Sequence, residues 1–226
     1  MSLRRFIGPL ILGVSGTVVL ASLGAWQVQR LEWKEGVLAE IEARIAEAPV
    51  DMPADLDPET DKYLPVTVSG DLGGTHLRVL TSIPRVGPGH RVISILTLDE
   101  GRRIMVDEGF VHETGNANPG PAADVTIVGN VHWPDDVNSS TPDPDMSNGL
   151  FFGRDVPLMA QALGTEPTLV VARSIEGVDP RATPLPVTTE GIPNNHLGYA
   201  VQWFGLALVW AGMTAFLLWR TAKRTV

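Results

Sequence analysis

Near its amino terminus the sequence reads FIGPLILGVSGTVVLASLGAWQVQ over residues 6–29, without one Asp, Glu, Lys or Arg. A second uncharged stretch, LGYAVQWFGLALVWAGMTAFLLW, occupies residues 197–219. A bilayer core about 30 Å thick needs about 20 apolar residues in a helix, so each stretch is long enough to cross it. Both are rich in Gly and Ala, which is common in membrane helices that pack against a neighbour. The sequence therefore predicts an integral membrane protein with two transmembrane α-helices.

A cleaved signal peptide is the alternative interpretation of the first stretch. Arg4 and Arg5 would be its basic region, and Ala21 and Ala25 are small enough for a cleavage site. The apolar part of a signal peptide is typically about 7–15 residues long, and this one is longer. Trp26 also lies at its far end, where an interfacial anchor belongs. An uncleaved membrane anchor is therefore favoured.

Charge is distributed unevenly and sets the predicted orientation. All 26 acidic residues and 12 of the 17 basic residues lie between Arg30 and Glu190, which gives this middle part a net charge of −14. The two ends carry only basic charges, and basic residues beside membrane spans stay in the cytoplasm. Both termini are therefore expected in the cytoplasm. The middle part is expected in the periplasm of a bacterium or the intermembrane space of a mitochondrion. Its acidity repels phosphate backbones, so no nucleic-acid partner is expected.

The prediction divides the chain into five segments. They are a cytoplasmic N-terminus (1–5), transmembrane helix 1 (6–29), a periplasmic domain (30–195), transmembrane helix 2 (196–219) and a cytoplasmic basic tail (220–226). The periplasmic domain is expected to be an α+β soluble domain rich in antiparallel strands, because short runs of Val, Ile and Thr alternate with Gly, Pro and Asn.

Three local elements of this domain are predicted. An amphipathic helix is expected at 31–48, a strand hairpin from 92–98 and 104–111, and a short helix at 156–163 that ends at Gly164.

No motif of an enzyme is present. The chain has no cysteine, which excludes disulfides, thiol-ligated zinc and iron–sulfur clusters. It also lacks the HExxH metal motif and the G-x-S-x-G nucleophile motif. No catalytic residue is therefore assigned, and an enzymatic activity is not expected. The histidines of the middle part are interpreted as exposed or hydrogen-bonded side chains.

His196 stands where a Pro-rich segment meets the second apolar stretch. At helical spacing, Tyr199 and Trp203 share its face. Imidazole is a standard axial ligand of haem iron, and flat aromatic rings suit a porphyrin, so His196 is a candidate haem ligand. The same residues also suit an interfacial aromatic belt, with Asn195 as a helix cap. Both interpretations stay open on spacing alone.

The first stretch ends in a cluster at the same predicted depth, which includes Trp26, Gln27, Arg30 and Trp33. Trp26, Arg30 and Trp33 are spaced to share one helix face. A guanidinium such as that of Arg30 makes a two-pronged contact with a carboxylate, and a haem propionate is a carboxylate. The alternative is an aromatic belt with a cation that reaches toward water, and the cluster alone favours that alternative.

Two motifs at the ends of the chain resemble the Surfeit locus protein 1 family. They are LGAWQVQRLEWK at residues 23–34 and NNHLGYAVQWFGLA at residues 194–207. Between them, YLPVTVSG at 63–70 and IMVDEGFV at 104–111 resemble the family's first strand and central hairpin. The family usually has Arg before the Gly of that hairpin, whereas this chain has Glu108, so no role of that arginine carries over.

The resemblance implies an assembly factor for haem-copper terminal oxidases, chiefly cytochrome c oxidase, in the bacterial cytoplasmic membrane. It implies that the chain binds haem a, with His196 as the iron ligand, and aids insertion of haem a into oxidase subunit I. Tyr199, Trp203, Trp26 and Arg30 then become expected pocket residues. Subunit I is the expected partner, and haem a synthase is a further candidate partner. The alternative function is a cofactor-free membrane scaffold that holds subunit I during assembly.

Overall fold

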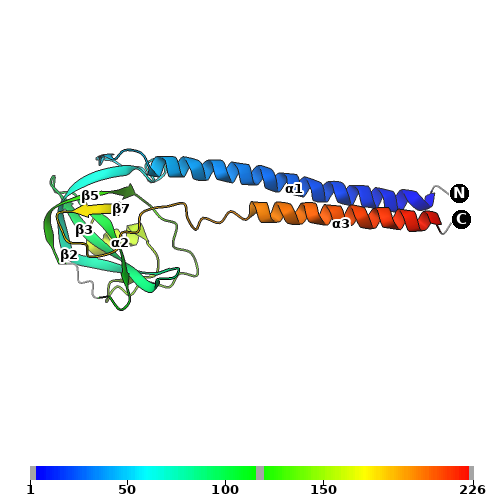
Figure 1. Cartoon of the computed structure of the whole chain (residues 1–226). Coiled ribbons are helices and arrows are strands. Elements are labelled where there is room, and N and C mark those ends of the chain that lie inside the picture. The colour runs from blue at the N-terminus through cyan, green and yellow to red at the C-terminus, as the bar shows by residue number, and fades with distance from the viewer. Residues whose placement is uncertain (1–3, 116–119, 224–226) are drawn as a thin grey trace. The chain divides into compact units, whose positions relative to one another are not determined.

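The computed structural model describes residues 4–115 and 120–223 (Figure 1). These residues form two compact units, each described by itself. The helical unit consists of the residues up to 40 and from 189 onwards, and the barrel unit consists of residues 41–188. Of the two predicted cytoplasmic ends, residues 1–3 and 224–226 lie outside the described residues.

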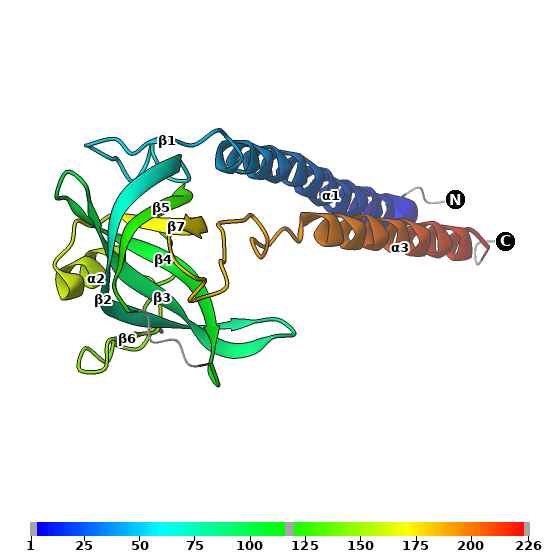
Figure 2. The same ribbon diagram turned by 60° about the vertical axis from the view of Figure 1, so that its left-hand side comes forward.

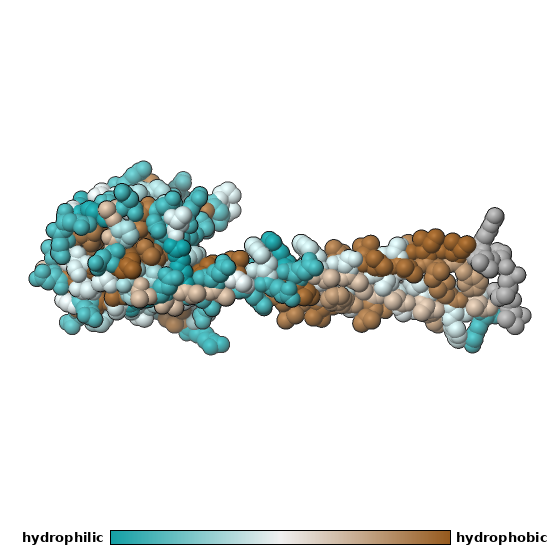
Figure 3. Space-filling model, turned by 90° about the horizontal axis from the view of Figure 1, so that it is seen from above, coloured by the Kyte–Doolittle hydropathy of each residue, from teal (hydrophilic) through white to brown (hydrophobic). Residues whose placement is uncertain are grey.

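Two helices, α1 (Arg4–Ile45) and α3 (His196–Lys223), lie side by side and antiparallel in the helical unit (Figures 1 and 2). Each contains a stretch long and apolar enough to cross a membrane. Their apolar side chains are largely exposed, as with Ile11 at 63% and Leu208 at 75%, and they give the helices the hydrophobic surface seen in Figure 3. The core helix of a soluble protein would bury these side chains. The two helices therefore fit a membrane protein.

The first helix continues past residue 29, where the predicted span ends. The amphipathic helix expected at 31–48 is the continuation of α1, which ends at Ile45. No proline occurs between Pro9 and Pro49. The i to i−4 hydrogen bonds therefore run on after the apolar stretch without a break.

Glycines let the two helices approach each other closely. A Cβ atom added at Gly24 would lie 2.8 Å from the ring of Phe204, and one added at Gly13 or Gly16 would overlap the side chain of Thr214 or Trp210. Trp210 Nε1 also donates a hydrogen bond of 3.2 Å to the carbonyl of Gly13. Small residues at the contact are the usual means of packing membrane helices, as the Gly content of both stretches indicated.

The barrel unit is built on a closed barrel of five strands (Figure 2). They are β2 (Pro65–Ile83), β3 (Gly87–Leu98), β4 (Arg103–His112), β5 (Ala122–Val131) and β7 (Leu169–Glu176). Around the barrel the order is β2–β3–β4–β7–β5, and β5 pairs again with β2, which closes the ring. Two short strands, β1 (Val50–Asp51) and β6 (Leu150–Phe151), add to β2, and α2 (Val156–Leu163) precedes β7.

The local predictions for this unit are confirmed. β3 and β4 form the expected antiparallel hairpin. α2 has the predicted bounds, with Asp155 as its N-cap and Gly164 in a left-handed conformation at its C-terminal end. The expectation of antiparallel strands holds for most of the barrel. The sheet is nevertheless mixed, because the β1–β2, β2–β6 and β4–β7 pairs are parallel.

The strands of the barrel bury apolar side chains on two faces. One set comes from all five strands and fills the barrel, with Leu96 and Ile104 among its members. The other set lies beneath α2 on the outside, with Ile93 and Met105 among its members. Since neighbouring residues of a strand point to opposite faces, β4 is buried on both faces, including every residue from Ile104 to Val111. Two acidic residues of β4 are therefore buried as well.

Gly109 of β4 adopts a φ of 122°. A side chain there would collide with the backbone of Thr183, and Phe110 exchanges two backbone hydrogen bonds of 2.7 and 2.9 Å with Thr183. We expect Gly109→Ala to lower the free energy of unfolding of the barrel unit by about 2 kcal/mol, because it adds backbone strain and a collision. Urea unfolding of the full chain in detergent, followed by hydrogen exchange of the strand amides, measures this loss.

Gly73→Ala is the matched control, since its Cβ would make only an ordinary contact of 3.6 Å with Ile95. An equal loss of stability in both variants would show that the conformation of Gly109 is not the cause.

Candidate functional site

His196 is the first residue of α3 and its side chain is half-buried. Its Nδ1 lies 2.8 Å from Oε1 of Gln27 on α1, and Gln27 is only 8% exposed. An amide oxygen only accepts hydrogen bonds, so the neutral ring with this partner carries its proton on Nδ1 and keeps the lone pair of Nε2. Metal-binding histidines use this arrangement, in which the second ring nitrogen donates to an oxygen that fixes the ring.

The role of Gln27 is the part of this site that the sequence did not assign. Gln27 and His196 are 169 residues apart, and neither forms a known motif with the other. The sequence does place both residues at the same end of the two apolar stretches, so their shared depth in the helix pair could have indicated this contact. A buried amide among apolar helix residues needs a hydrogen-bond partner, and His196 is that partner.

Arg30 and Trp33 form a stacked pair on the exposed surface of α1. The guanidinium carbon of Arg30 lies 3.9 Å from the centre of the Trp33 ring, which is the geometry of a cation–π contact. Among the described residues Arg30 makes no ion pair. Its charge therefore stays available to an anionic ligand. Trp26 is exposed one turn earlier on the same helix.

The two aromatic residues predicted on α3 lie near the face of His196, as their spacing requires. Tyr199 is exposed and Trp203 is half-buried. Within the described residues, no hydrogen bond or ring contact joins His196 to Tyr199, Trp203, Trp26 or Arg30. The structure thus brings Gln27 to His196 and leaves the other four side chains free to meet a ligand from outside.

These residues fit a haem group. The site offers one imidazole in the tautomer that ligates iron, exposed aromatic surfaces and a cation without an ionic partner. Such a set would hold a porphyrin by one protein ligand at the surface of a helix pair. No group of three or more His, Asp or Glu that could hold a bare metal ion occurs in the described part of the chain.

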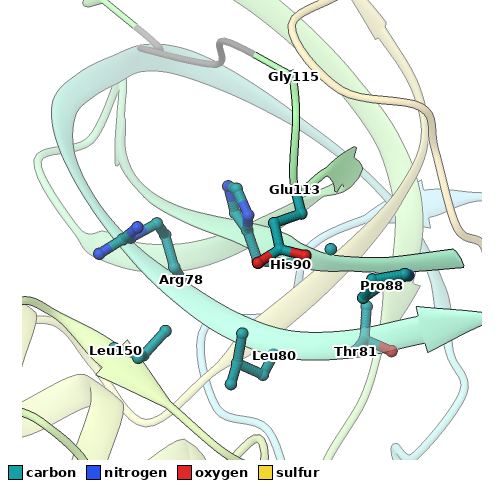
Figure 4. A pocket seen from close by; sticks show the side chains of 9 residues that line it. Arg78, Leu80, Thr81, Pro88, His90, Glu113, Gly115 and Leu150 are labelled. Carbon is teal, nitrogen blue, oxygen red and sulfur yellow. The ribbon is translucent and has the colours of Figure 1, made fainter.

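The barrel unit has a hollow of about 700 Å³ at one end of β2 and β3 (Figure 4). Arg78, His90 and Glu113 line it together with apolar residues. Burial lowers the pKa of His90, and the nearby Arg78 and His76 lower it further. Arg78 already donates to the carbonyl of Asn148 at 3.2 Å. One cation, one anion and one neutral imidazole do not select a single class of ligand.

The two buried acids of β4 each have an arginine partner. Asp107 is 0% exposed, and its Oδ2 accepts a hydrogen bond of 2.6 Å from Arg91. Burial raises the pKa of Asp107, while Arg91 and Arg154 act against that rise. Glu108 is 2% exposed and lies 3.0 Å from Arg181. At the position where the family usually has an arginine, this chain therefore has an acid that is neutralised by an arginine from elsewhere.

A second part of this charged network surrounds His132. Arg154 donates to Asp136 at 2.6 Å. Burial would raise the pKa of Asp136, but the hydrogen bond from Arg154 outweighs it and the pKa is lowered. Burial, together with the positive charges of Arg154 and Lys62, lowers the pKa of His132 to about 4. Arg154 thus lies between Asp136, at 2.6 Å, and Asp107, at 3.9 Å.

Comparison with known proteins identifies the family. Residues 15–208 match the model of the SURF1 family. Surfeit locus protein 1 of Rattus norvegicus is 28% identical, over 89% of this chain and 72% of that protein. The Xenopus tropicalis protein of the same name is 31% identical, over 84% of this chain and 69% of that protein. The corresponding figures for the Homo sapiens protein are 29%, 84% and 71%. The predicted family is therefore confirmed, and the chain belongs to the SURF1 family.

Proposed function

We propose that this chain assists the assembly of a haem-copper terminal oxidase by binding haem a in the membrane and aiding its insertion into oxidase subunit I. Membership of the SURF1 family implies a role in cytochrome c oxidase assembly. The observation that supports haem binding is the hydrogen bond between Gln27 and His196, which leaves Nε2 as an iron ligand.

Each predicted site residue has a defined task in this proposal. His196 binds the iron of haem a through Nε2, and Gln27 keeps the ring in the correct tautomer and orientation. Arg30 pairs with a propionate, which a guanidinium binds with two parallel hydrogen bonds. Trp26, Tyr199 and Trp203 cover the porphyrin with aromatic surface.

Haem a is the cargo of the protein, so its binding has to be reversible. His196 is at the first position of a helix, where opening the local structure costs little free energy. A single protein ligand at an open surface also leaves the other face of the iron to the acceptor. Both features favour transfer over storage.

The proposed location is the cytoplasmic membrane of a bacterium, with both termini in the cytoplasm and the barrel unit in the periplasm. The start of α1 and the end of α3 lie at the same end of the helical unit (Figure 1), and basic residues at this end include Arg220 and Lys223. Basic residues beside a span favour the cytoplasmic side.

A cellular experiment tests the function. In cells that lack this protein, the wild-type chain and His196→Ala are expressed, and the haem a content and activity of the oxidase are measured. We expect His196→Ala to restore much less of both, at equal chain levels, with Asn195→Ala as the matched control. Full restoration by His196→Ala would contradict haem binding by this residue and favour the cofactor-free scaffold.

Gln27→Met is expected to weaken haem binding by about 10–100-fold, the usual effect of removing the partner that orients a metal-binding histidine. Methionine keeps the length of the side chain but offers only a weak acceptor to the N–H of Nδ1. Absorbance titration of the purified full chain with haem measures the affinity. Gln29→Met, at an exposed position of the same helix, is the control. Unchanged affinity in Gln27→Met would contradict the orienting role.

A further inference from the structure

An apolar groove of about 590 Å³ runs along one flank of the helical unit between α1 and α3. Leu12, Gly16 and Val19 line it on α1, and Leu206, Trp210 and Met213 line it on α3. Gly16 allows the ring of Trp210 to lie against α1, because a Cβ atom at Gly16 would overlap that ring. The ring of Trp210 is held in place by its hydrogen bond to the carbonyl of Gly13. The groove is therefore a formed feature of the helix pair.

The groove lies deeper in the helix pair than His196. Leu206 and Met213 follow His196 by 10 and 17 residues in α3. At 1.5 Å per residue, the groove extends from about 15 to about 25 Å from His196 along the helix axis. A ligand bound at His196 reaches the groove only if it carries a long extension.

The groove and the exposed aromatic residues share one flank. On α3, Tyr199, Leu206 and Met213 are spaced seven residues apart, which is nearly two helical turns. On α1 the same spacing joins Val19 of the groove to Trp26 and Trp33. Along its length the flank thus changes from Arg30 with Trp33, through Trp26 and Tyr199, to groove walls that are mainly apolar.

We propose that this groove holds the isoprenoid tail of haem a, an inference that rests on the proposed function. Haem a carries two propionates on one edge of the porphyrin and a long isoprenoid chain on the opposite part of the ring. Arg30 complements the charge of the propionates, the aromatic rings suit the porphyrin and the apolar groove suits the tail. The order of these three features along the flank is the order of the three parts of the ligand.

The groove contributes packing contacts and orientation. When the tail moves from the bilayer into the groove, it passes between two equally apolar surroundings. The hydrophobic effect therefore adds little to the affinity. A preference of about tenfold for a haem with the tail over a haem without it is therefore expected. The groove would also keep the porphyrin upright, with its propionates at Arg30.

Haem o and haem b separate the contribution of the tail, because haem o has the isoprenoid chain, haem b lacks it, and neither has the formyl group of haem a. The full chain in detergent is titrated with each haem, and absorbance gives both dissociation constants. We expect wild type to bind haem o about tenfold more tightly than haem b. Val19→Trp, which fills the groove, should remove this preference and leave the affinity for haem b unchanged.

Val18→Trp is the matched control, because Val18 and Val19 are 56% and 57% exposed and lie on different faces of α1. Equal binding of haem o and haem b by wild type would overturn the groove assignment while haem binding stands; the groove would then serve a lipid or another helix. A preference that survives in Val19→Trp would overturn it too. Failure to bind any haem would overturn both the groove assignment and the proposed function.

Discussion

Arg91→Met will lower the free energy of unfolding of the barrel unit by about 3–5 kcal/mol, the usual cost of removing one partner of a buried ion pair. The carboxylate of Asp107 is 0% exposed and its nearest cation is Arg91, at 2.6 Å. After the substitution the remaining cation is Arg154, whose Nη1 is 3.9 Å away. That distance is too long for a hydrogen bond, so a buried charge loses its main compensation.

The double variant Arg91→Met/Asp107→Leu distinguishes the cost of an unpaired buried charge from the cost of altered packing. It removes both charges, so we expect most of the lost stability to return. Urea unfolding of the full chain in detergent, followed by hydrogen exchange of the strand amides, compares the variants. If Arg91→Met were as stable as wild type, or the double variant less stable than Arg91→Met, the ion pair would not be what stabilises this part of the barrel.

His132 will make the barrel unit less stable as the pH falls from about 6.5 to 4. Its pKa is lowered from 6.5 to about 4, its ring packs 5.3 Å from that of Tyr63, and its Nδ1 has no hydrogen-bond partner in the described part of the chain. Between these two pH values the unfolded chain binds a proton that the folded chain does not. The free energy of unfolding of the barrel unit therefore has its full value above about pH 6.5. It falls by roughly 3 kcal/mol as the pH drops to 4.

His132→Phe tests this dependence, because phenylalanine keeps a ring against Tyr63 and does not titrate. Urea midpoints of the barrel unit are compared for wild type and variant at several pH values from 7 to 4. The acidic residues titrate in both proteins, so the difference between the two curves isolates His132. We expect the variant to lose less stability toward acid, and parallel curves would contradict the assignment.

The features predicted well from the sequence are those set by neighbouring residues. The two long helices follow from uncharged stretches, and α2 follows from Asp155 and Gly164 at its ends. The closed barrel was not predicted, because it depends on pairing of Met105–Asp107 with Leu169–Val171 in parallel. No local pattern marks partners so far apart. The burial of Asp107 depends on the same pairing, and Glu108 is buried against Ser94 and Arg181, which are 14 and 73 residues away in the sequence.

In the site, too, the residue marked by its neighbours in the sequence was predicted, and the contact between distant residues was not. His196 was predicted as the ligand from its place at a helix start and from the family motif. Its bond to Gln27 joins two ends of the chain, and only the packing of α1 on α3 brings them together. The continuity of the apolar groove with Trp26 and Tyr199 likewise depends on which flanks of the two helices meet.

The visible absorption spectrum of the purified full chain, prepared from cells that make haem a, tests the proposed function most directly. Wild type, His196→Ala and Asn195→Ala are prepared in parallel and their haem is extracted and quantified. We predict haem a in wild type and in Asn195→Ala, and its loss from His196→Ala. Equal haem content in wild type and His196→Ala, or none in wild type, would contradict haem a binding through His196.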